Sequence, residues 1–126
     1  MTIAWIIDDD EEMIGAIQMM LKLLKVDSRY FLSARTAVEA LMEQKLPDVL
    51  ILDINMPEVT GMDLLEFLRQ HPDWKHLPVV MLSTEAADVQ VDQALAMGAD
   101  AYVTKPVSVD ELEAALQKAS SARQKM

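Results

Sequence analysis

The sequence predicts a doubly wound α/β fold, in which helices cover both faces of one five-stranded parallel sheet. Five short, mostly aliphatic segments alternate along the chain with five segments whose apolar residues recur at helical spacing. The aliphatic segments are nearly continuous, which is typical of parallel strands that are buried on both faces. Because crossovers between parallel strands are right-handed, the helices divide between the two sides and form a three-layer (βα)5 sandwich.

The first half of the chain contains three predicted strands and two predicted helices. Residues 3–7, 29–32 and 49–52 are short runs rich in bulky apolar side chains, which favour strands. The first helix is predicted from the helical spacing of Met13, Ile14, Ile17, Leu21 and Leu24. Ser33 can cap the second helix. The apolar face of that helix comprises Ala37, Val38, Leu41 and Met42.

The third helix and the fourth strand follow the third strand. Thr60 and, three residues later, Asp63 form a capping signature at the start of a helix. The apolar face of this helix comprises Leu64, Leu65 and Leu68. Residues 78–82 form another aliphatic run and therefore predict the fourth strand.

The last three elements are a helix, a strand and a helix. Residues 85–97 are predicted to form the fourth helix, which ends at Gly98. Residues 101–104 predict the fifth strand. Ser108 and Glu111 form a capping box for the fifth helix. The inner face of the fifth helix comprises Val109, Leu112, Leu116 and Ala119.

The composition indicates one folded globular domain. The chain has 126 residues, of which 52% are hydrophobic and 25% are charged. No apolar run approaches the roughly 20 residues of a membrane-spanning helix, and the N-terminus lacks the pattern of a secretion signal. There is no cysteine, which excludes disulfides and thiolate metal sites, so we expect a cytoplasmic protein that does not bind a membrane.

The charge of the chain limits its partners. The formal net charge is -10 at pH 7. Nucleic-acid binding needs a basic face that contacts phosphates, so we expect no nucleic-acid binding by this domain. A cation, or a partner with basic patches, complements this charge.

Reactive side chains follow four of the five predicted strands. Acidic residues 8–12 follow the first strand, Asp53 follows the third, Ser83 follows the fourth and Lys105 follows the fifth. In an open α/β sheet, ligands bind at the carboxyl ends of the strands. We therefore expect these side chains to converge on one site.

This set of residues indicates a divalent cation and phosphoryl transfer. Asp8, Asp9 and Asp53 would repel one another without a cation, and oxygen ligands suit Mg²⁺ or Mn²⁺. One such ion together with Lys105 would make the site neutral. A carboxylate beside a divalent ion and a lysine is suited to attack a phosphoryl group, so Asp53 is the candidate nucleophile. Ser83 could donate a hydrogen bond to a phosphoryl oxygen.

Two further properties of this site are predicted. Pro57 and Gly61 turn the chain sharply after Asp53, so we expect its carboxylate to be accessible. The acidic side chains repel one another in the empty site. Replacing Asp9 with Asn is therefore expected to stabilise the metal-free fold by about 1 kcal/mol.

The chain resembles, end to end, the receiver domain of two-component response regulators, and in particular a single receiver of the chemotaxis-regulator type. The matching segments are IIDDDEE, LILDINMPEVTG, VVMLSTE, GADAYVTKP and the capped last helix, in this order. The resemblance implies a flavodoxin-like sheet with the strand order 2-1-3-4-5. It also implies one receiver domain over residues 1–126, with no output domain in this chain.

The resemblance assigns a role to each residue of the expected site. Asp53 is the implied phospho-acceptor, and Lys105 is the implied catalytic lysine. Asp8 and Asp9 are the acid pair that holds Mg²⁺, Asp9 more directly and Asp8 partly through water. The backbone carbonyl of Asn55 is a further implied ligand.

Other implied residues concern switching and the lifetime of the phosphoryl group. Ser83 and Tyr102 are the implied switch pair, which relays the change to the face formed by helix four, strand five and helix five. Asn55 and Glu85 occupy the positions that tune phosphoryl lifetime, and their polarity favours a short-lived state. Pro106 is the implied cis proline.

The resemblance also implies the partners. A histidine kinase or a histidine phosphotransfer protein donates the phosphoryl group, and an unidentified protein receives the signal. A phosphorylation-dependent homodimer and a newly exposed docking face are both compatible with this interpretation. We expect the chain to catalyse only its own phosphorylation and dephosphorylation and not to act as an enzyme on an external substrate.

Three other functions fit these residues less well. An Mg²⁺-dependent phosphatase that uses an aspartyl phosphate needs a second aspartate two residues after the nucleophile, where this chain has Asn55. A flavodoxin-type electron carrier needs a loop after strand one that binds a flavin phosphate, and the acidic residues 8–12 would repel it. A phosphorylation-independent binding module of the receiver type is less favoured, because every expected site residue is present.

Purely structural interpretations remain open for several residues. Residues 10–12 are acids at the start of a helix, where they favour the helix dipole. Ser83 is also suited to cap the fourth helix, and Tyr102 is also compatible with an ordinary strand position. Trp74 is interpreted as an anchor for its loop.

Overall fold

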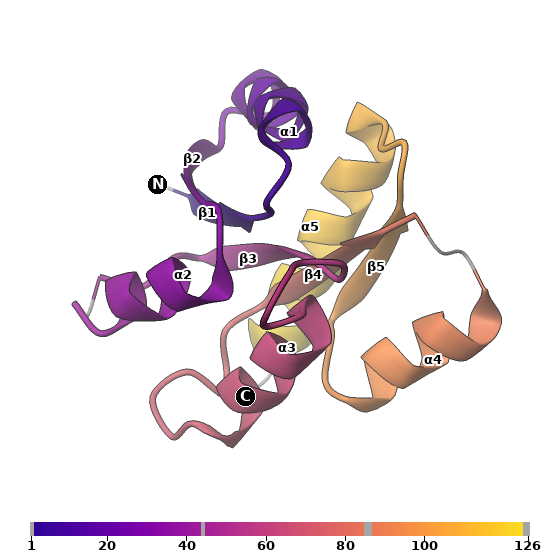
Figure 1. Ribbon diagram of the computed structural model, residues 1–126. Helices are drawn as coiled ribbons and strands as arrows, with labels where there is room; N and C mark the ends of the chain where they lie inside the picture. Colours follow the sequence, from indigo (N-terminus) through magenta and orange to yellow (C-terminus); the bar gives the residue numbers. More distant parts are fainter. Residues whose placement is uncertain (1, 44, 85–86, 125–126) are drawn as a thin grey trace.

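Five parallel strands form one sheet in the order β2-β1-β3-β4-β5. The computed structural model describes residues 2–43, 45–84 and 87–124 (Figure 1). The strands are β1 (Ile3–Ile7), β2 (Asp27–Phe31), β3 (Val49–Asp53), β4 (Val79–Ser83) and β5 (Ala101–Thr104). Every neighbouring pair is parallel, so the predicted fold class and strand order are confirmed.

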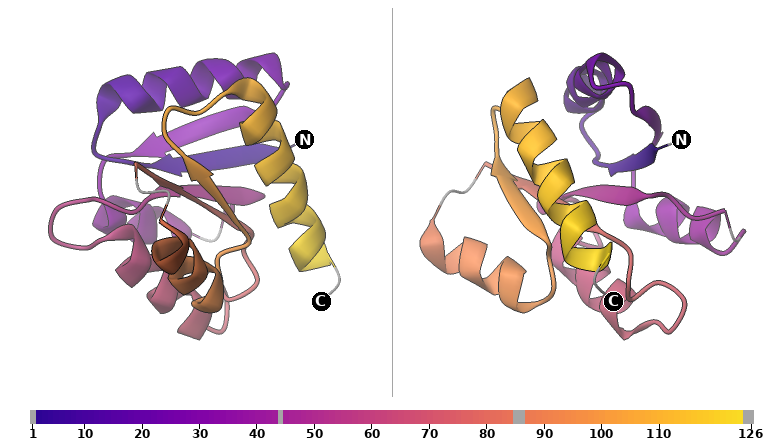
Figure 2. Two further views of the ribbon diagram at one scale, coloured as in Figure 1. Left: turned by 90° about the vertical axis from the view of Figure 1, so that its right-hand side faces the viewer. Right: turned by 180° about the vertical axis from the view of Figure 1, so that it is seen from behind.

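Helices cover both faces of the sheet. They are α1 (Glu11–Leu23), α2 (Ala34–Leu41), α3 (Gly61–Gln70), α4 (Asp88–Ala96) and α5 (Val109–Gln124). Helices α1 and α5 pack on one face, and α2, α3 and α4 pack on the other (Figure 2). In the part of the chain that the structure describes, no helix is both long and apolar enough to cross a bilayer.

The core is divided between the two faces of the sheet, because alternate residues of a strand point in opposite directions. In β1, Ala4 and Ile6 pack with α1 and α5, whereas Trp5 and Ile7 pack with α2, α3 and α4. All residues of β3 and β4 are buried. Burial on both faces explains why these strands are continuous aliphatic runs in the sequence.

The three side-chain caps predicted from the sequence are present at the starts of α2, α3 and α5. The Ser33 hydroxyl accepts a hydrogen bond from the backbone N–H three residues later, at 3.2 Å. Thr60 and Asp63 form a reciprocal capping box at the start of α3. The Ser108 hydroxyl accepts a hydrogen bond from the N–H of Glu111 at 3.2 Å. The three caps predicted from the sequence are therefore confirmed.

Two elements differ from their predicted boundaries, whereas the other strands lie within one residue of theirs. Strand β2 begins at Asp27 and ends at Phe31, because polar residues before the apolar run also pair with β1 at the edge of the sheet. Helix α4 begins at Asp88, after Ala87, whose side chain makes no capping hydrogen bond. The predicted start of this helix, at residue 85, lies outside the described residues.

Asp100 is the centre of a buried ion-pair cluster at the amino ends of β4 and β5. Its carboxylate accepts hydrogen bonds from Arg69 of α3 at 3.0 Å, from Arg123 of α5 at 2.8 Å and from the N–H of Val79 at 2.9 Å. Both arginines also donate to the carbonyl of Gly98. Burial, with the neighbouring Arg123, lowers the pKa of Arg69 to about 10, although Asp100 acts to raise it. The cluster joins helices from opposite faces of the sheet, and no pattern in the sequence predicts it.

Candidate functional site: an acidic cluster with a lysine

The candidate site lies at the carboxyl ends of four strands. Asp8 follows β1, Asp53 ends β3, Ser83 ends β4 and Lys105 follows β5. The ends of β3, β4 and β5 lie side by side, because Asp53 is paired with Leu82 and Ser83 is paired with Thr104. Parallel pairing therefore brings side chains that are up to 97 positions apart in the sequence to one edge of the sheet.

Lys105 connects the two buried acids of the site. Its Nζ donates to Oδ1 of Asp53 at 3.1 Å and to Oδ2 of Asp8 at 3.4 Å. The backbone N–H of Lys105 donates to the carbonyl of Ser83 at 2.8 Å, which fixes the start of the loop after β5. The peptide bond between Lys105 and Pro106 is cis.

Three carboxylates converge beside this lysine. Oxygen atoms of Asp8, Asp9 and Asp53 lie within 4.8 Å of one another. Asp8 is fully buried and Asp53 is 3% exposed, whereas Asp9 is exposed. The Asp53 side chain is therefore less exposed than its place at the strand end suggested, although its carboxylate lies beside that of the exposed Asp9. The charge of Asp53 can be buried because the Lys105 ammonium offsets it at short range.

The surroundings of the site raise the pKa of Asp8 and the pKa of Lys105. Burial, and secondarily the negative charge of Asp53, raises the pKa of Asp8 above its ordinary value of 3.8. The N–H of Asp10, which donates to Oδ1 of Asp8 at 2.9 Å, and the Lys105 ammonium both act against this shift. Burial acts to lower the pKa of Lys105, but its contacts with Asp53 and Asp8 raise it overall. Lys105 is therefore protonated at neutral pH.

The donor set fits a hard divalent cation. All the candidate ligands are carboxylate oxygens, which Mg²⁺ prefers. Three carboxylates and one ammonium leave the cluster with two negative charges, which one divalent cation would offset. Asp8, Asp9 and Asp53 are the described side chains that could hold such an ion.

The loop between β3 and α3 is held close to Asp53. The N–H of Gly61 donates to the carbonyl of Ile54 at 3.0 Å, and the N–H of Ile54 donates to the carbonyl of Leu82 at 2.9 Å. A Cβ atom at Gly61 would collide with the backbone carbonyl of Asp53, so only glycine permits this approach. Asn55 lies in the same loop and its side chain is exposed.

Glu58 in this loop has a backbone conformation that favours glycine. Its φ is 66°, in the left-handed region that costs a residue with a Cβ atom roughly 1 kcal/mol. Replacing Glu58 with Gly is expected to raise the free energy of unfolding by about 0.5–1 kcal/mol, measured by urea denaturation. Glu58→Ala is the matched control, because it removes the charge but keeps the Cβ atom. Equal stabilisation by both substitutions would show that the charge, and not the backbone, is responsible.

The remaining predicted residues are distributed as follows. Ser83 is fully buried at the end of β4. The N-cap residue of α4 as described, Asp88–Ala96, is Ala87, so the interpretation of Ser83 as a cap for a helix that begins at residue 85 stays a prediction. Tyr102 is partly buried and packs against the core on the side of α2, α3 and α4. Glu85 lies outside the described residues.

Asp10 caps α1, in addition to the helix-dipole role expected for residues 10–12. Its carboxylate accepts hydrogen bonds from the N–H groups of Glu12 at 3.0 Å and Met13 at 3.3 Å, which caps α1. Its own N–H holds the Asp8 carboxylate. An aspartate placed three residues before an apolar helical pattern is the sequence signal that could have identified this cap.

Comparison with known proteins places the chain in a family. The sequence profile of the response regulator receiver domain matches residues 4–117, which is most of the chain. This chain is a response regulator receiver domain. Receiver domains of two-component systems are signalling switches that accept a phosphoryl group, interact with histidine kinases or phosphotransfer proteins, and bind Mg²⁺ at an acidic pocket.

Relatives of the receiver domain include single-domain and longer proteins. The chain is 33% identical over 113 residues to the chemotaxis protein CheY of Pseudomonas aeruginosa, covering 90% of this chain and 91% of CheY. It is 37% identical over 121 residues to the transcriptional regulatory protein KdpE of Mycobacterium tuberculosis, covering 94% of this chain. The chain spans about half (51%) of KdpE and 16% of the protein RcaC of Microchaete diplosiphon.

Solved structures share the fold. The receiver domain matches the chemotaxis protein CheY4 of Vibrio cholerae with a TM-score of 0.84 and 26% identity, over 94% of this chain and 98% of CheY4. It matches the receiver domain of the Francisella response regulator 1452 with a TM-score of 0.85 and 26% identity, over 97% of this chain and 98% of that one. The flavodoxin-like receiver fold therefore extends over nearly the whole chain.

The charge excess at the site predicts how the metal-free receiver domain responds to substitution. Replacing Asp8 with Asn is expected to raise the free energy of unfolding in EDTA by about 1 kcal/mol, because it removes a buried charge next to Asp53. Asp9→Asn is the control, and its effect is expected to be smaller because Asp9 is exposed. Urea denaturation at neutral pH measures both. Equal or lower stability of Asp8→Asn than of the unsubstituted protein would contradict the assignment.

The same substitution makes a prediction about pH. Because the pKa of Asp8 is raised in the folded state, the folded protein binds a proton more readily there than the unfolded chain does. Asp8 therefore contributes increasing stability as the pH falls from neutrality through its folded pKa toward 3.8. This contribution is expected to be absent from Asp8→Asn when unfolding in EDTA is measured across that range.

Proposed function

We propose that this receiver domain is switched by phosphorylation of Asp53, with a histidine kinase or a histidine phosphotransfer protein as the donor. The observation that carries the proposal is the 3.1 Å contact between Asp53 and Lys105, inside a cluster of three carboxylates at the strand ends. A carboxylate in this setting has a fixed ammonium beside it and further carboxylates suited to a divalent ion.

The chemical step is a transfer of one phosphoryl group. An Asp53 oxygen attacks phosphorus and forms an O–P bond, while the N–P bond of the donor phosphohistidine breaks and its electron pair remains on the imidazole nitrogen. The Lys105 ammonium, already within hydrogen-bond distance of Oδ1, is positioned to offset charge on a phosphoryl oxygen. Asp8, Asp9 and the backbone carbonyl of Asn55 would hold Mg²⁺, which supplies further positive charge at the reacting oxygens.

Phosphorylation would change the local charge and thereby the conformation. The side chain of residue 53 would carry about two negative charges instead of one, with three new acceptor oxygens. Ser83 ends the strand next to Asp53 and is suited to donate to one of them. Tyr102, on the neighbouring strand and partly buried, would then reposition, so that the change reaches the face formed by α4, β5 and α5.

Several finer properties belong to the same proposal. We expect residues 1–126 to form one receiver domain that passes its signal to a downstream protein partner in the cytoplasm, without turning over an external substrate. Asn55, which is exposed beside the site, is suited to place a water that hydrolyses the phosphoryl group, so we expect a short-lived phosphorylated state. The dependence of the oligomeric state on phosphorylation is measured by sedimentation of the labelled and unlabelled protein.

The test of the proposal is phosphorylation by a small donor. The protein is incubated with acetyl phosphate and Mg²⁺, and its intact mass is measured with and without EDTA. We expect a gain of one phosphoryl group that requires the metal. A protein that never gains this mass, although it binds Mg²⁺, would instead fit a receiver that acts without phosphorylation.

A further inference from the structure

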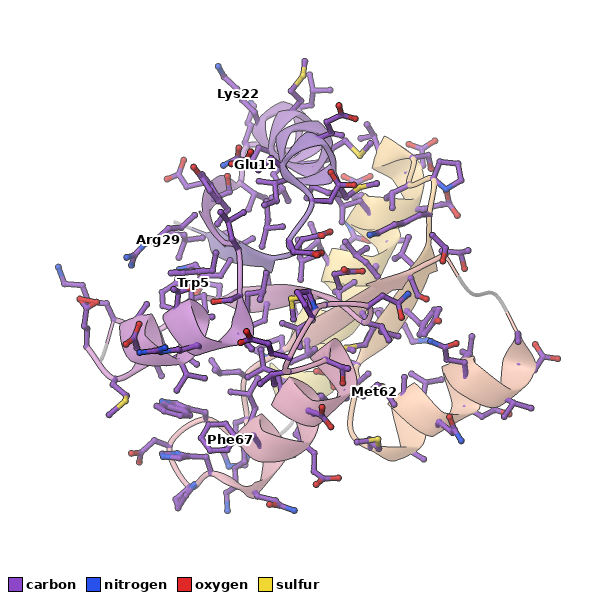
Figure 3. All side chains as sticks on the ribbon, viewed as in Figure 1. Trp5, Glu11, Lys22, Arg29, Met62 and Phe67 are labelled. Carbon is purple, nitrogen blue, oxygen red and sulfur yellow. The ribbon has the colours of Figure 1, made fainter. Side chains whose placement is uncertain are left out.

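An apolar groove lies between α2 and α3. Its lining residues are not part of the face formed by α4, β5 and α5, which the switch residues would change. Two adjoining hollows of about 560 and 460 Å³ share Val38 of α2 and Phe67 of α3 as lining residues. Phe67 lies on the outer side of its helix (Figure 3). Four exposed large apolar side chains line these hollows: Met42, Leu46, Val59 and Phe67. We call this surface the α2/α3 groove. An exposed apolar surface of this kind is typical of an interaction site.

One wall of the α2/α3 groove is built from stacked rings. The rings of His71 and Trp74 are stacked with their centroids 3.8 Å apart, and the ring of Phe67 lies 5.9 Å from that of Trp74. Trp74 is buried and fixes the other two. Because these side chains are already ordered by one another, a ligand that packs against them loses little additional conformational freedom.

The walls indicate what kind of segment fits. Val38 of α2 and Met42, which directly follows that helix with helical backbone angles, are four residues apart, as are Asp63 and Phe67 of α3, so each pair forms a row along its helix. Because helices form both walls of the groove, an extended peptide would find no strand edge there to pair with. A helix packed with its apolar side chains between the two rows is the arrangement that such a groove accepts.

The charges at the rim indicate the sign of the partner. Three carboxylates and one guanidinium line the groove, namely Glu39, Asp63, Asp73 and Arg35. None of these four takes part in an ion pair with another described residue. A partner with basic side chains would therefore gain attraction along this rim. A second copy of the chain, with a net charge of -10, would instead add repulsion.

We propose that the α2/α3 groove binds an amphipathic helix of another protein, whose apolar face enters the groove and whose lysine or arginine side chains lie along the acidic rim. The proposal does not depend on phosphorylation of Asp53. It assigns the receiver domain a second contact surface, on the flank opposite α1 and α5.

The probe is a synthetic helical peptide of leucine and lysine, with leucines at positions i, i+3, i+4 and i+7. It is titrated into the isotope-labelled full chain, and backbone amide shifts are followed by NMR. We expect shifts concentrated on α2, α3 and the residues around Val59. A peptide of the same composition in scrambled order is expected to bind at least tenfold more weakly, because its leucines no longer share one face.

Two matched pairs of variants test the apolar and the charged parts separately. Met42 in the groove is 67% exposed and Met19 on α1 is 71% exposed, so both tolerate replacement by Ser. Met42→Ser is expected to weaken peptide binding by about fivefold, the effect of losing part of one buried apolar side chain, and Met19→Ser to leave it unchanged. Glu39→Lys is expected to weaken binding more than Glu113→Lys, which makes the same charge change on α5.

Several results would overturn the proposal. These are shifts centred on α1 or on α4 and α5, equal binding of the scrambled peptide, equal effects within either pair of variants, and no binding at millimolar peptide. Equal binding of a leucine and glutamate peptide would show that the rim charges have no role. A dimer in sedimentation experiments that Met42→Ser dissociates would identify a second copy as the occupant and would likewise overturn it.

Discussion

Replacing Asp53 with Asn is expected to abolish labelling of the receiver domain by acetyl phosphate. The amide keeps the shape of the side chain but lacks the carboxylate that attacks phosphorus. The substitution also removes one negative charge from the cluster of three, so the protein is expected to remain folded. Intact-mass spectrometry in Mg²⁺ measures the labelling, and circular dichroism checks the fold.

Asp10→Asn is the matched control for this experiment. Asp10 lies next to the acidic cluster, but its carboxylate caps α1, a task that asparagine performs equally well. We expect this variant to keep most of the labelling. Stoichiometric labelling of Asp53→Asn would show that the nucleophile lies elsewhere, and loss of labelling in both variants would point to a general effect of charge.

Replacing Asp100 with Ala is expected to have the largest effect on stability. The substitution leaves Arg69 and Arg123 without the carboxylate that offsets their charges, while both guanidiniums remain largely buried. Removing one partner from a buried ion pair costs about 3–5 kcal/mol, and partial exposure of the arginines places this case near the lower end. The free energy of unfolding, measured with urea, is therefore expected to fall by about 3 kcal/mol.

Asp92→Ala separates this effect from the loss of any acidic side chain in the region. Asp92 is exposed on α4 and has no ion pair among the described residues. Its replacement is expected to change stability by less than about 0.5 kcal/mol. If Asp100→Ala were as stable as Asp92→Ala, the cluster would have no net stabilising role.

The layers of the fold could be predicted from the sequence because both faces of the sheet are covered. Complete burial of β3 and β4 requires continuous aliphatic runs, and that signal survives without any tertiary information. Strand β2 carries a weaker signal because it lies at the edge, where Asp27, Ser28 and Arg29 pair with β1 but are not enclosed in the core. Its first residues therefore could not be recognised from hydrophobic pattern.

The residues of the site could also be predicted, because parallel strands place their carboxyl ends at one edge. What the sequence could not give was the burial of each acid. Asp8 and Asp9 are adjacent and chemically identical, yet Asp8, directly after β1, is buried and Asp9 is exposed. The larger stabilisation is consequently expected from substitution of Asp8, whereas the sequence alone had suggested Asp9.

The ion-pair cluster around Asp100 shows a different limit. Arg69, Asp100 and Arg123 are 31 and 23 positions apart, and each alone is compatible with an ordinary surface charge. Only the packing of α3 and α5 around the amino ends of β4 and β5 brings them together. Hydrophobic periodicity carries no information about such a contact.

A crystal structure of the protein grown with Mg²⁺ and beryllofluoride tests the central claim most directly, because beryllofluoride mimics a phosphoryl group on a carboxylate oxygen. We expect the beryllium on an Asp53 oxygen, the Lys105 ammonium on a fluorine, and the cation held by the carboxylates of Asp8 and Asp9. Beryllofluoride bound to any other residue, or a cation that does not contact Asp8 or Asp9, would contradict the account.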